Sequence, residues 1–141
     1  MAALTLLVAG CGAYPQDPNQ TTAQIEERGT IRIGLIALSE SQNAQDMQEF
    51  AELLATSYEV DPHVVNGSAE ALMSQLKRGE LDIVIGELPK NSPWAKEAAF
   101  TAAFSKNHVS KSEPVVRGAV HLGENRWLLS VERMIEEQTH E

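Results

Sequence analysis

The sequence predicts an α/β fold, a single three-layer lobe around a mainly parallel sheet of about five strands. Residues 31–38 and 81–86 are almost continuously apolar and rich in β-branched side chains, which is typical of strands covered on both faces. Segments with apolar residues at helical spacing alternate with the strands, and the loops between them are short. This alternation favours right-handed crossovers and a parallel sheet.

The domain is expected to open with a short helix. Thr21 and Gln24 have the spacing of a capping box, in which each side chain bonds to the backbone of the other residue. Gly29 ends this helix, because glycine adopts the left-handed conformation that many helix exits require. The first buried strand, residues 31–38, follows directly.

A second helix and strand come next. Apolar residues recur at helical spacing over residues 42–58, and a strand is expected over residues 58–65. Pro62 favours an edge position for that strand, since proline cannot donate to a neighbouring strand. Ser68 is expected to cap a further helix, which Gly79 ends before the buried strand 81–86.

The C-terminal third has weaker patterns at first. Residues 93–99 are expected to form a helical turn or two before the apolar segment 100–104, and residues 105–114 are polar and read as a loop. Residues 114–122 have the composition of a strand, and residues 125–138 place apolar side chains on one side of a last helix. The chain therefore has one series of elements without internal repeats.

The composition limits the class of protein. The chain has 141 residues, of which 43% are hydrophobic, enough for one compact domain. No run approaches the ~20 apolar residues of a membrane span. The net charge of −9 argues against binding to nucleic acid and against docking on an anionic membrane surface. A single cysteine excludes an internal disulfide.

That cysteine, Cys11, follows Leu-Val-Ala-Gly at positions 7–10. The segment resembles the lipobox of bacterial lipoproteins, which implies that residues 1–10 are a remnant signal peptide and that Cys11 carries a lipid such as palmitate. Residues 11–20 are rich in Pro, Gln and Asn and read as a flexible stalk, followed by the lobe at 21–138 and a disordered tail at 139–141. The alternative is a buried cysteine that packs as a small hydrophobe.

Three segments carry a family resemblance. Residues 25–34, the helix and Leu-Asp-Ile-Val-Ile-Gly strand at 68–86, and residues 98–104 resemble family 3 of the bacterial extracellular solute-binding proteins, which serves ABC transporters for polar amino acids. The resemblance covers residues 22–104 and implies the first lobe of a type II periplasmic-binding fold.

Members of that family have two lobes that close on a ligand. Here nine residues separate Phe104 from Pro114, where the family has its second lobe. Residues 115–122 followed by 123–127 resemble the family's return strand and final helix. The resemblance therefore implies a lone first lobe, with the second lobe absent and replaced by a loop.

The candidate ligand site lies beyond the carboxyl ends of the parallel strands, where open α/β sheets bind ligands. The residues expected there are Ser39, Glu40, Asn66, Ser68, Glu87, Lys90, Asn91, Trp94 and Thr101. Relatives that bind amino acids hold the α-carboxylate with an arginine where this chain has Trp94, so Lys90 and Lys96 are candidate substitutes. Two plainer interpretations stay open, that Ser68 only caps its own helix and that Trp94 only covers the helix beneath it.

Enzymatic sites are not expected. The chain has no Gly-x-Ser-x-Gly elbow for a nucleophile, and Asp82 and Glu87 do not form an obvious acid–base pair. Asp82 is interpreted as a structural residue at the start of its strand. His63, His108, His121 and His140 lack the spacing of metal ligands, so no metal or cofactor is expected.

The sequence thus predicts a lipid-anchored, solute-binding-like lipoprotein on the periplasmic face of a bacterial membrane, without enzymatic activity. Its single lobe is expected to act as a binding or interaction module for a membrane transporter or sensor, or to pair with a second copy as a homodimer. The alternative is a binding protein for a small polar solute, with residues 105–114 as a minimal lid. A hydrolytic enzyme is a remote third hypothesis.

Overall fold

The computed structural model describes residues 17–36, 42–89, 91–104 and 115–140. Cys11, Ser39, Glu40, Lys90 and the expected lid at 105–114 lie outside these ranges. In chain order the elements are α1 (Thr21–Arg28), β1 (Thr30–Ile36), α2 (Gln42–Ser57), β2 (Asp61–Gly67), α3 (Ala69–Lys77), β3 (Ile83–Glu87), the 3-10 helix η1 (Pro93–Lys96), β4 (Ala98–Phe100), β5 (Val116–His121) and α4 (Asn125–Thr139).

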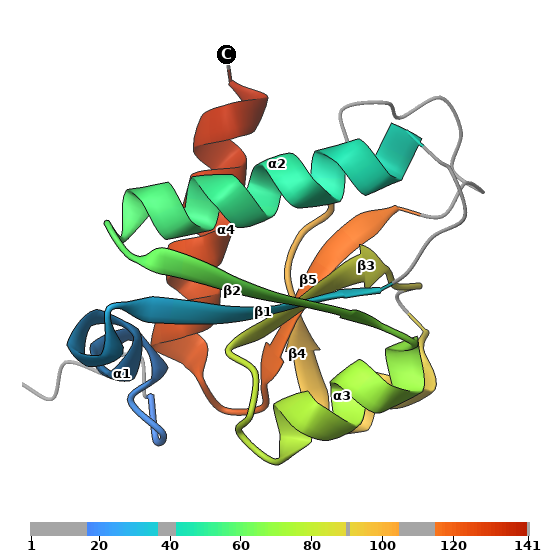
Figure 1. The fold of residues 1–141 in the computed structure, drawn as a ribbon. Helices are drawn as coiled ribbons and strands as arrows, with labels where there is room; N and C mark the ends of the chain where they lie inside the picture. The colour runs from blue at the N-terminus through green and yellow to red at the C-terminus, as the bar shows by residue number, and fades with distance from the viewer. Residues whose placement is uncertain (1–16, 37–41, 90, 105–114, 141) are drawn as a thin grey trace, which may run out of the picture.

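The five strands form one sheet in the order β2-β1-β3-β5-β4 (Figure 1). β1 pairs in parallel with β2 and β3, whereas β5 is antiparallel to both β3 and β4. Four strands therefore run in one direction and β5 runs against them. This arrangement confirms the predicted α/β lobe with a mainly parallel sheet, and it places Pro62 on the edge strand β2.

Helices cover both faces of the sheet, with α2 and α4 on one face and α3 on the other (Figure 1). The larger core lies under α2 and α4 and includes Ile25, Ile33, Phe50, Ile85, Val120 and Trp127. The smaller core lies under α3 and includes Leu72, Leu76, Val84, Leu88 and Ala119. Burial of these side chains on two faces explains why the central strands are almost continuously apolar.

The last two elements complete the larger core. β5 lies between β3 and β4, and the side chain of Trp127 in α4 is fully buried. Its indole Nε1 donates to the backbone oxygen of Asp82 at 2.9 Å, and its ring packs edge-on against Tyr58 with 5.5 Å between centroids. The segment after residue 114 is thus an integral part of this sheet and its core.

Close packing between the central strands explains one glycine. A Cβ atom at Gly86 in β3 would lie 2.5 Å from Cδ1 of Ile36, at the end of β1. No larger residue fits there without moving one of the two strands.

The second strand begins later than the sequence pattern suggests. β2 starts at Asp61, because Tyr58 to Val60 form a turn after α2 in which Glu59 has φ 52° and the amide of Val60 donates to Ala55 at 3.0 Å. Tyr58 and Val60 pack against the larger core from this turn. Their apolar character therefore reflects burial beside the sheet and not strand pairing.

The capping box expected at Thr21 and Gln24 is wrong. Gln20 occupies the position before α1 with φ 52°, and the hydroxyl of Thr21 donates to Glu124 at 2.8 Å instead of capping the helix. The amide of Gln24 donates to the backbone oxygen of Asn19 at 2.7 Å. Gly29 ends α1 in the left-handed conformation (φ 66°), as predicted.

The stalk expected over residues 11–20 needs correction in its second half. The amide of Gln20 donates to the oxygen of Asp17 at 2.9 Å, so these residues form a turn. The amide of Asn19 donates to Glu124 at 2.6 Å, which ties the turn to the start of α4. Residues 17–20 of the expected stalk are therefore held against the lobe.

Candidate functional site

The carboxyl ends of β1, β2 and β3 lie at one edge of the sheet, as the parallel pairing requires. We call this the carboxyl edge. The residues just beyond β2 are polar and open to solvent, since both Asn66 and Ser68 are exposed. α2 and α3 both begin at this edge and direct their amide N–H groups toward it.

Ser68 caps α3 through its side chain. Its Oγ accepts a hydrogen bond from the amide of Ala71 at 3.3 Å, which confirms the predicted cap. Because Oγ is the acceptor in this bond, its hydroxyl proton remains available as a donor.

Glu87 is half-buried at the end of β3. One of its carboxylate oxygens accepts from the side-chain amide of Asn43 at 2.5 Å, a bond that joins the sheet to the first turn of α2. A carboxylate beside a helix N-terminus is electrostatically favoured. Asn43 was not predicted from the sequence, because a polar residue in the first turn of a helix has no distinctive local pattern.

Trp94, which was expected at this edge, lies elsewhere. The chain after β3 passes along α3 and forms η1, where Trp94 is half-buried against the smaller core. The end of this segment lies beside the last turn of α3. There Nζ of Lys77 forms an ion pair with Oε1 of Glu97 at 2.9 Å. The indole of Trp94 thus covers the core below α3, in agreement with the plainer of the two interpretations.

Thr101 is only 2% exposed and its hydroxyl is already used. Oγ1 accepts from the amide of Gly118 at 2.9 Å and donates to the oxygen of Ala102 at 2.7 Å. We therefore remove Thr101 from the candidate site. Asn91 is exposed in the loop before η1, while Ser39, Glu40 and Lys90 lie outside the described residues.

Arg117 is a buried cation near the carboxyl edge that the sequence analysis missed. It pairs in register with Gly86, one residue before the end of β3, and is only 9% exposed. Its Nη1 donates to the backbone oxygen of Thr101 at 3.2 Å, whereas Nε is buried and has no hydrogen-bond partner among the described residues. The ion pairs among the described residues do not include this guanidinium.

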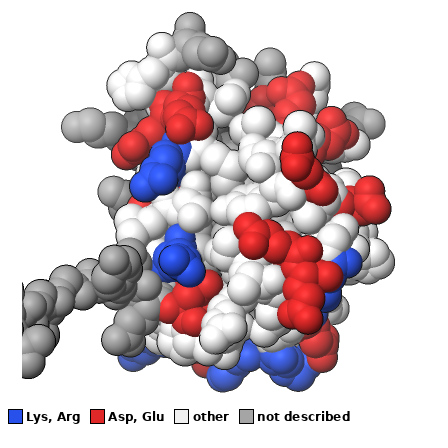
Figure 2. All heavy atoms as spheres, turned by 90° about the vertical axis from the view of Figure 1, so that its left-hand side faces the viewer, with Lys and Arg blue, Asp and Glu red and all other residues white. Residues whose placement is uncertain are grey.

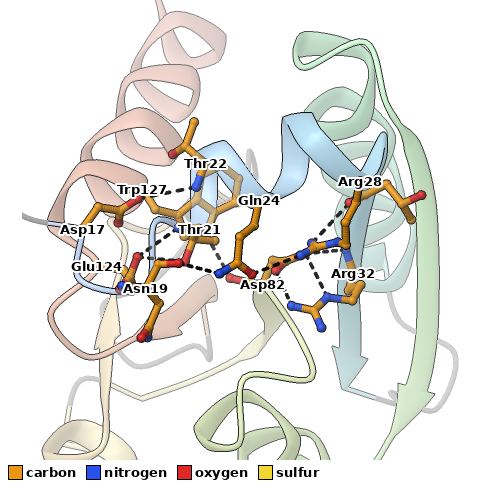
Figure 3. Close-up of polar contacts among 11 residues, drawn as sticks. Asp17, Asn19, Thr21, Thr22, Gln24, Arg28, Arg32, Asp82, Glu124 and Trp127 are labelled. Carbon is orange, nitrogen blue, oxygen red and sulfur yellow. Dashed lines mark hydrogen bonds and ion pairs between the residues drawn. The ribbon is translucent and has the colours of Figure 1, made fainter.

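The opposite end of the sheet, which we call the amino edge, is densely bonded (Figure 3). Asp82 is 4% exposed, and its carboxylate accepts from Arg28 Nη2 at 2.7 Å and from Arg32 Nη2 and the Arg32 amide, both at 2.8 Å. Both carboxylate oxygens are therefore held by guanidinium groups. The structural role expected for Asp82 therefore agrees with its contacts.

Asp82 and Glu87 stand at opposite ends of β3. Five residues of extended chain separate them by roughly 16 Å, too far for an acid–base pair acting on one small substrate. Within the described ranges, no group of three or more His, Cys, Asp or Glu side chains could hold a metal ion.

A groove runs between α2 and α4, on the face away from α3. It has a volume of about 320 Å³. Its floor is apolar and includes the stacked rings of Phe50 and Phe104, with 4.1 Å between centroids. The carboxylates of Asp46, Glu49 and Glu52 line one side. No sequence signal marked this groove, because it depends on how two distant helices meet.

Acidic side chains dominate the charged surface. Figure 2 shows groups of Asp and Glu spread around an uncharged central area, with less Lys and Arg surface. This distribution agrees with the net charge of −9. None of the helices in the described part of the chain is both long enough and apolar enough to cross a membrane.

No protein-family model and no curated protein sequence matches the chain. Solved structures do. A mutant of the arginine-bound form of domain 1 from TmArgBP, the ArgBP of T. maritima, superposes with a TM-score of 0.74 and 18% identity. That match covers 85% of this chain and 99% of the domain.

Two reconstructed ancestral proteins match over a smaller part. An ancestral cationic amino acid solute-binding protein has a TM-score of 0.53 and 22% identity, covering 67% of this chain and 48% of its own. An ancestral cyclohexadienyl dehydratase has a TM-score of 0.51 and 26% identity, covering 60% of this chain and 38% of its own. The chain thus spans less than half the length of these two proteins. Its fold is that of a single lobe of a solute-binding protein.

Proposed function

We propose that this chain is an extracytoplasmic, lipid-anchored protein of solute-binding type, whose single lobe is a binding or interaction module for a membrane transporter or sensor. A closely related second candidate is capture of a small polar solute by the lobe itself. Both use the carboxyl edge as the recognition surface.

The observation that carries the proposal is the match to an isolated domain. The arginine-bound form of domain 1 from TmArgBP is a lone lobe with a ligand, and this chain superposes on 99% of it. A single lobe of this fold therefore suffices to hold a ligand in at least one protein. This precedent favours the second candidate, although a half-open cleft buries less of a small ligand than two lobes do.

The polar groups at the carboxyl edge suit a small zwitterion or anion. Exposed Asn66 and Ser68 beside the start of α3 can hydrogen-bond a carboxylate. Glu87, already held by Asn43, can accept from an ammonium or guanidinium group. Arg117 lies close to the same edge and is a candidate partner for an anionic group, because Trp94, at the position of the clamping arginine in the family that the sequence resembles, packs against the smaller core instead.

The location rests on the N-terminal sequence. Leu-Val-Ala-Gly before Cys11 resembles a lipobox, and an acyl anchor would keep the acidic lobe at the membrane without any contact with lipid headgroups. The partner would then be a membrane transporter or sensor, with a second copy of the chain as the alternative. We propose no cofactor, no metal and no catalytic activity.

Thermal unfolding with added ligand separates the two candidates. Arginine and a panel of polar amino acids are added to the folded lobe, and solute capture predicts that one of them raises Tm. The stabilisation at a hundredfold excess over Kd is about 2.7 kcal/mol. The variant Glu87→Gln should weaken this effect, while Glu80→Gln, an exposed acid at the other edge, should leave it unchanged.

If no member of the panel raises Tm, solute capture is refuted for that panel and the interaction module is tested directly. The purified lobe is crosslinked to membranes prepared from cells that express the full chain. Crosslinks that reach the carboxyl edge and disappear in the Glu87→Gln variant support the module. Crosslinks that are unaffected by that change, or none at all, contradict it.

The lipid anchor has its own test. Cells that express the full chain are labelled with a palmitate analogue, and the membrane fraction is compared for the natural chain and Cys11→Ser. Label and membrane association should both depend on Cys11. Unlabelled protein in the aqueous fraction would show that the anchor is absent.

A further inference from the structure

The chain enters the lobe at the amino edge, beside the start of α4 (Figure 3). Glu124, which precedes α4, is only 1% exposed. It accepts hydrogen bonds from the Asn19 amide at 2.6 Å, the Thr21 amide at 3.2 Å and the Thr21 hydroxyl at 2.8 Å. One buried carboxylate thus fastens a segment that lies more than 100 positions earlier in the chain.

A second carboxylate, that of Asp17, meets Glu124 at this point. Oδ2 of Asp17 accepts from the amide of Thr22 at 3.5 Å, and the backbone amide of Trp127 also faces it. Oδ1 is buried and has no donor among the described residues, yet the side chain is in hydrogen-bond contact with Glu124. Two carboxylates in contact are both satisfied only when one of them carries a proton.

We propose that Asp17 and Glu124 form a proton-dependent clasp, which holds the N-terminal segment against the start of α4 while one proton is shared and loosens when both carboxylates are ionised. Protonation of the clasp thus controls how strongly the N-terminal segment is attached to the lobe. It lies at the amino edge and acts independently of any ligand at the carboxyl edge.

The electrostatics assign the proton to Asp17. Burial, followed by contact with the Glu124 carboxylate, raises the pKa of Asp17 to about 6, and the amides of Thr22 and Trp127 offset part of that rise. Burial also acts to raise the pKa of Glu124, but the hydrogen bonds from Asp17, Asn19 and Thr21 hold it below its usual value. Glu124 is therefore the ionised acceptor, and Asp17 titrates near neutral pH.

The surrounding groups do not neutralise a second negative charge. His121, at the end of β5, has Nδ1 3.4 Å from the side chain of Asn19, which lies between it and the carboxylates. Tyr58 packs against the larger core and lies within electrostatic range of Asp17, Glu26 and Arg133. The four ion pairs within the described residues involve neither member of the clasp.

Amide hydrogen exchange tests the clasp in the full chain. Protection of the Asn19 and Thr21 amides, corrected for intrinsic exchange rates, should fall about tenfold between pH 5 and pH 7.5. Asp17→Asn keeps a donor toward Glu124 at every pH and should stay protected at both. The matched control Glu26→Gln removes a nearby exposed acid and should behave like the natural chain.

Two hydrogen-exchange results would overturn the clasp. One is equal protection of these amides at both pH values in the natural chain, and the other is an undiminished fall in Asp17→Asn. The amide of Arg32, which donates to Asp82, is the internal reference and should not change. Because a variant can fail to fold, carbon NMR of the Asp17 carboxyl in the natural chain provides a second measurement. A titration midpoint near 4 instead of near 6 would also refute the proposal.

Discussion

The two edges of the sheet use polar residues in different ways. At the amino edge, Asp82 and Glu124 are almost fully buried and saturated with hydrogen bonds from distant parts of the chain. At the carboxyl edge, Asn66 and Ser68 are exposed, and the Asn43–Glu87 bond is only partly buried. The first edge therefore stabilises the lobe, whereas the second keeps polar groups available for another molecule.

This contrast separates stability from recognition within one small domain. A binding surface needs polar groups that are positioned but incompletely satisfied, and such groups require a rigid frame beneath them. Here β1 and β3 join the two edges directly. Substitutions at the amino edge should therefore change the free energy of unfolding, and those at the carboxyl edge should change binding.

The largest effect is expected for Trp127→Ala. The indole is fully buried, and its loss leaves a cavity and an unpaired backbone oxygen at Asp82. We expect the free energy of unfolding to fall by about 4 kcal/mol, measured by urea denaturation. The control Leu129→Ala removes an exposed side chain from the same helix and should change little.

Asp82→Ala should be nearly as damaging. It leaves Arg28 and Arg32 without their shared counter-ion and removes the acceptor of the Arg32 amide. Because both guanidinium groups are partly exposed, we expect a loss of about 3 kcal/mol, at the lower end of the range for buried ion pairs. Glu80→Gln, which breaks the exposed pair with Arg78, should leave the urea midpoint unchanged. A small effect of Asp82→Ala would contradict the idea that polar residues at the amino edge stabilise the lobe.

The pH dependence of stability tests the amino edge more finely. The pKa of Asp17 is raised from 3.8 to about 6 by folding, so the folded lobe binds more protons than the unfolded chain in that interval. The stabilisation is complete below pH 3.8 and is lost as the pH rises through 6. The lowered pKa of Glu124 acts in the opposite sense, but only below its ordinary value of 4.5.

Between pH 4.5 and 7, unfolding measurements should therefore show Asp17→Asn gaining about 1 kcal/mol relative to the natural chain. This value is smaller than the stabilisation that the whole pKa shift of Asp17 would give, because Asp17 is partly exposed and solvent weakens the effect. A difference between the two proteins that does not change with pH would contradict the prediction.

At the carboxyl edge, Ser68→Ala should cost about 1 kcal/mol, because it removes the side-chain cap of α3. Ser68→Asp restores a capping oxygen and should recover that stability. If a ligand carboxylate docks beside the start of α3, Ser68→Asp should nevertheless abolish the ligand-induced rise in Tm. Equal ligand effects in Ser68→Asp and the natural chain would place the ligand elsewhere.

The smallest stability change is expected for Glu87→Gln. Glutamine keeps the oxygen that accepts from Asn43, so we expect a change within 0.5 kcal/mol. Binding of a cationic or zwitterionic solute should weaken at least tenfold, measured by calorimetry. If Glu87→Gln destabilised the lobe as strongly as Asp82→Ala, the carboxyl edge would be structural as well.

Local sequence patterns predicted those strands and helix ends that depend on neighbouring residues alone. Continuous apolar runs marked β1 and β3, and Gly29 and Ser68 marked helix ends through their own backbone or hydroxyl. Thr21 was misassigned because its hydroxyl bonds to Glu124, 103 positions away, a contact that no window of sequence contains.

The candidate site was predicted in part for the same reason. Asn66, Ser68 and Glu87 follow from the rule that parallel strands end at one edge. Trp94 did not lie there, since the loop after β3 passes along α3 and carries no periodicity that reveals its path. Thr101 is unsuitable because its hydroxyl is buried and already bonded within the fold. Arg117 was missed because a single arginine inside a strand pattern gives no sign of how deeply it is buried.

The hydrogen bond from the amide of Phe104 to the oxygen of Val116, at 3.1 Å, has a consequence for how such proteins change over evolution. The two segments that flank residues 105–114 are therefore joined by a backbone hydrogen bond of their own. A connection of almost any length can join them, because loop-closure entropy grows only slowly with length. An extra domain can thus be gained or lost at this junction while the rest of the architecture stays intact, which makes it a natural point of modular exchange.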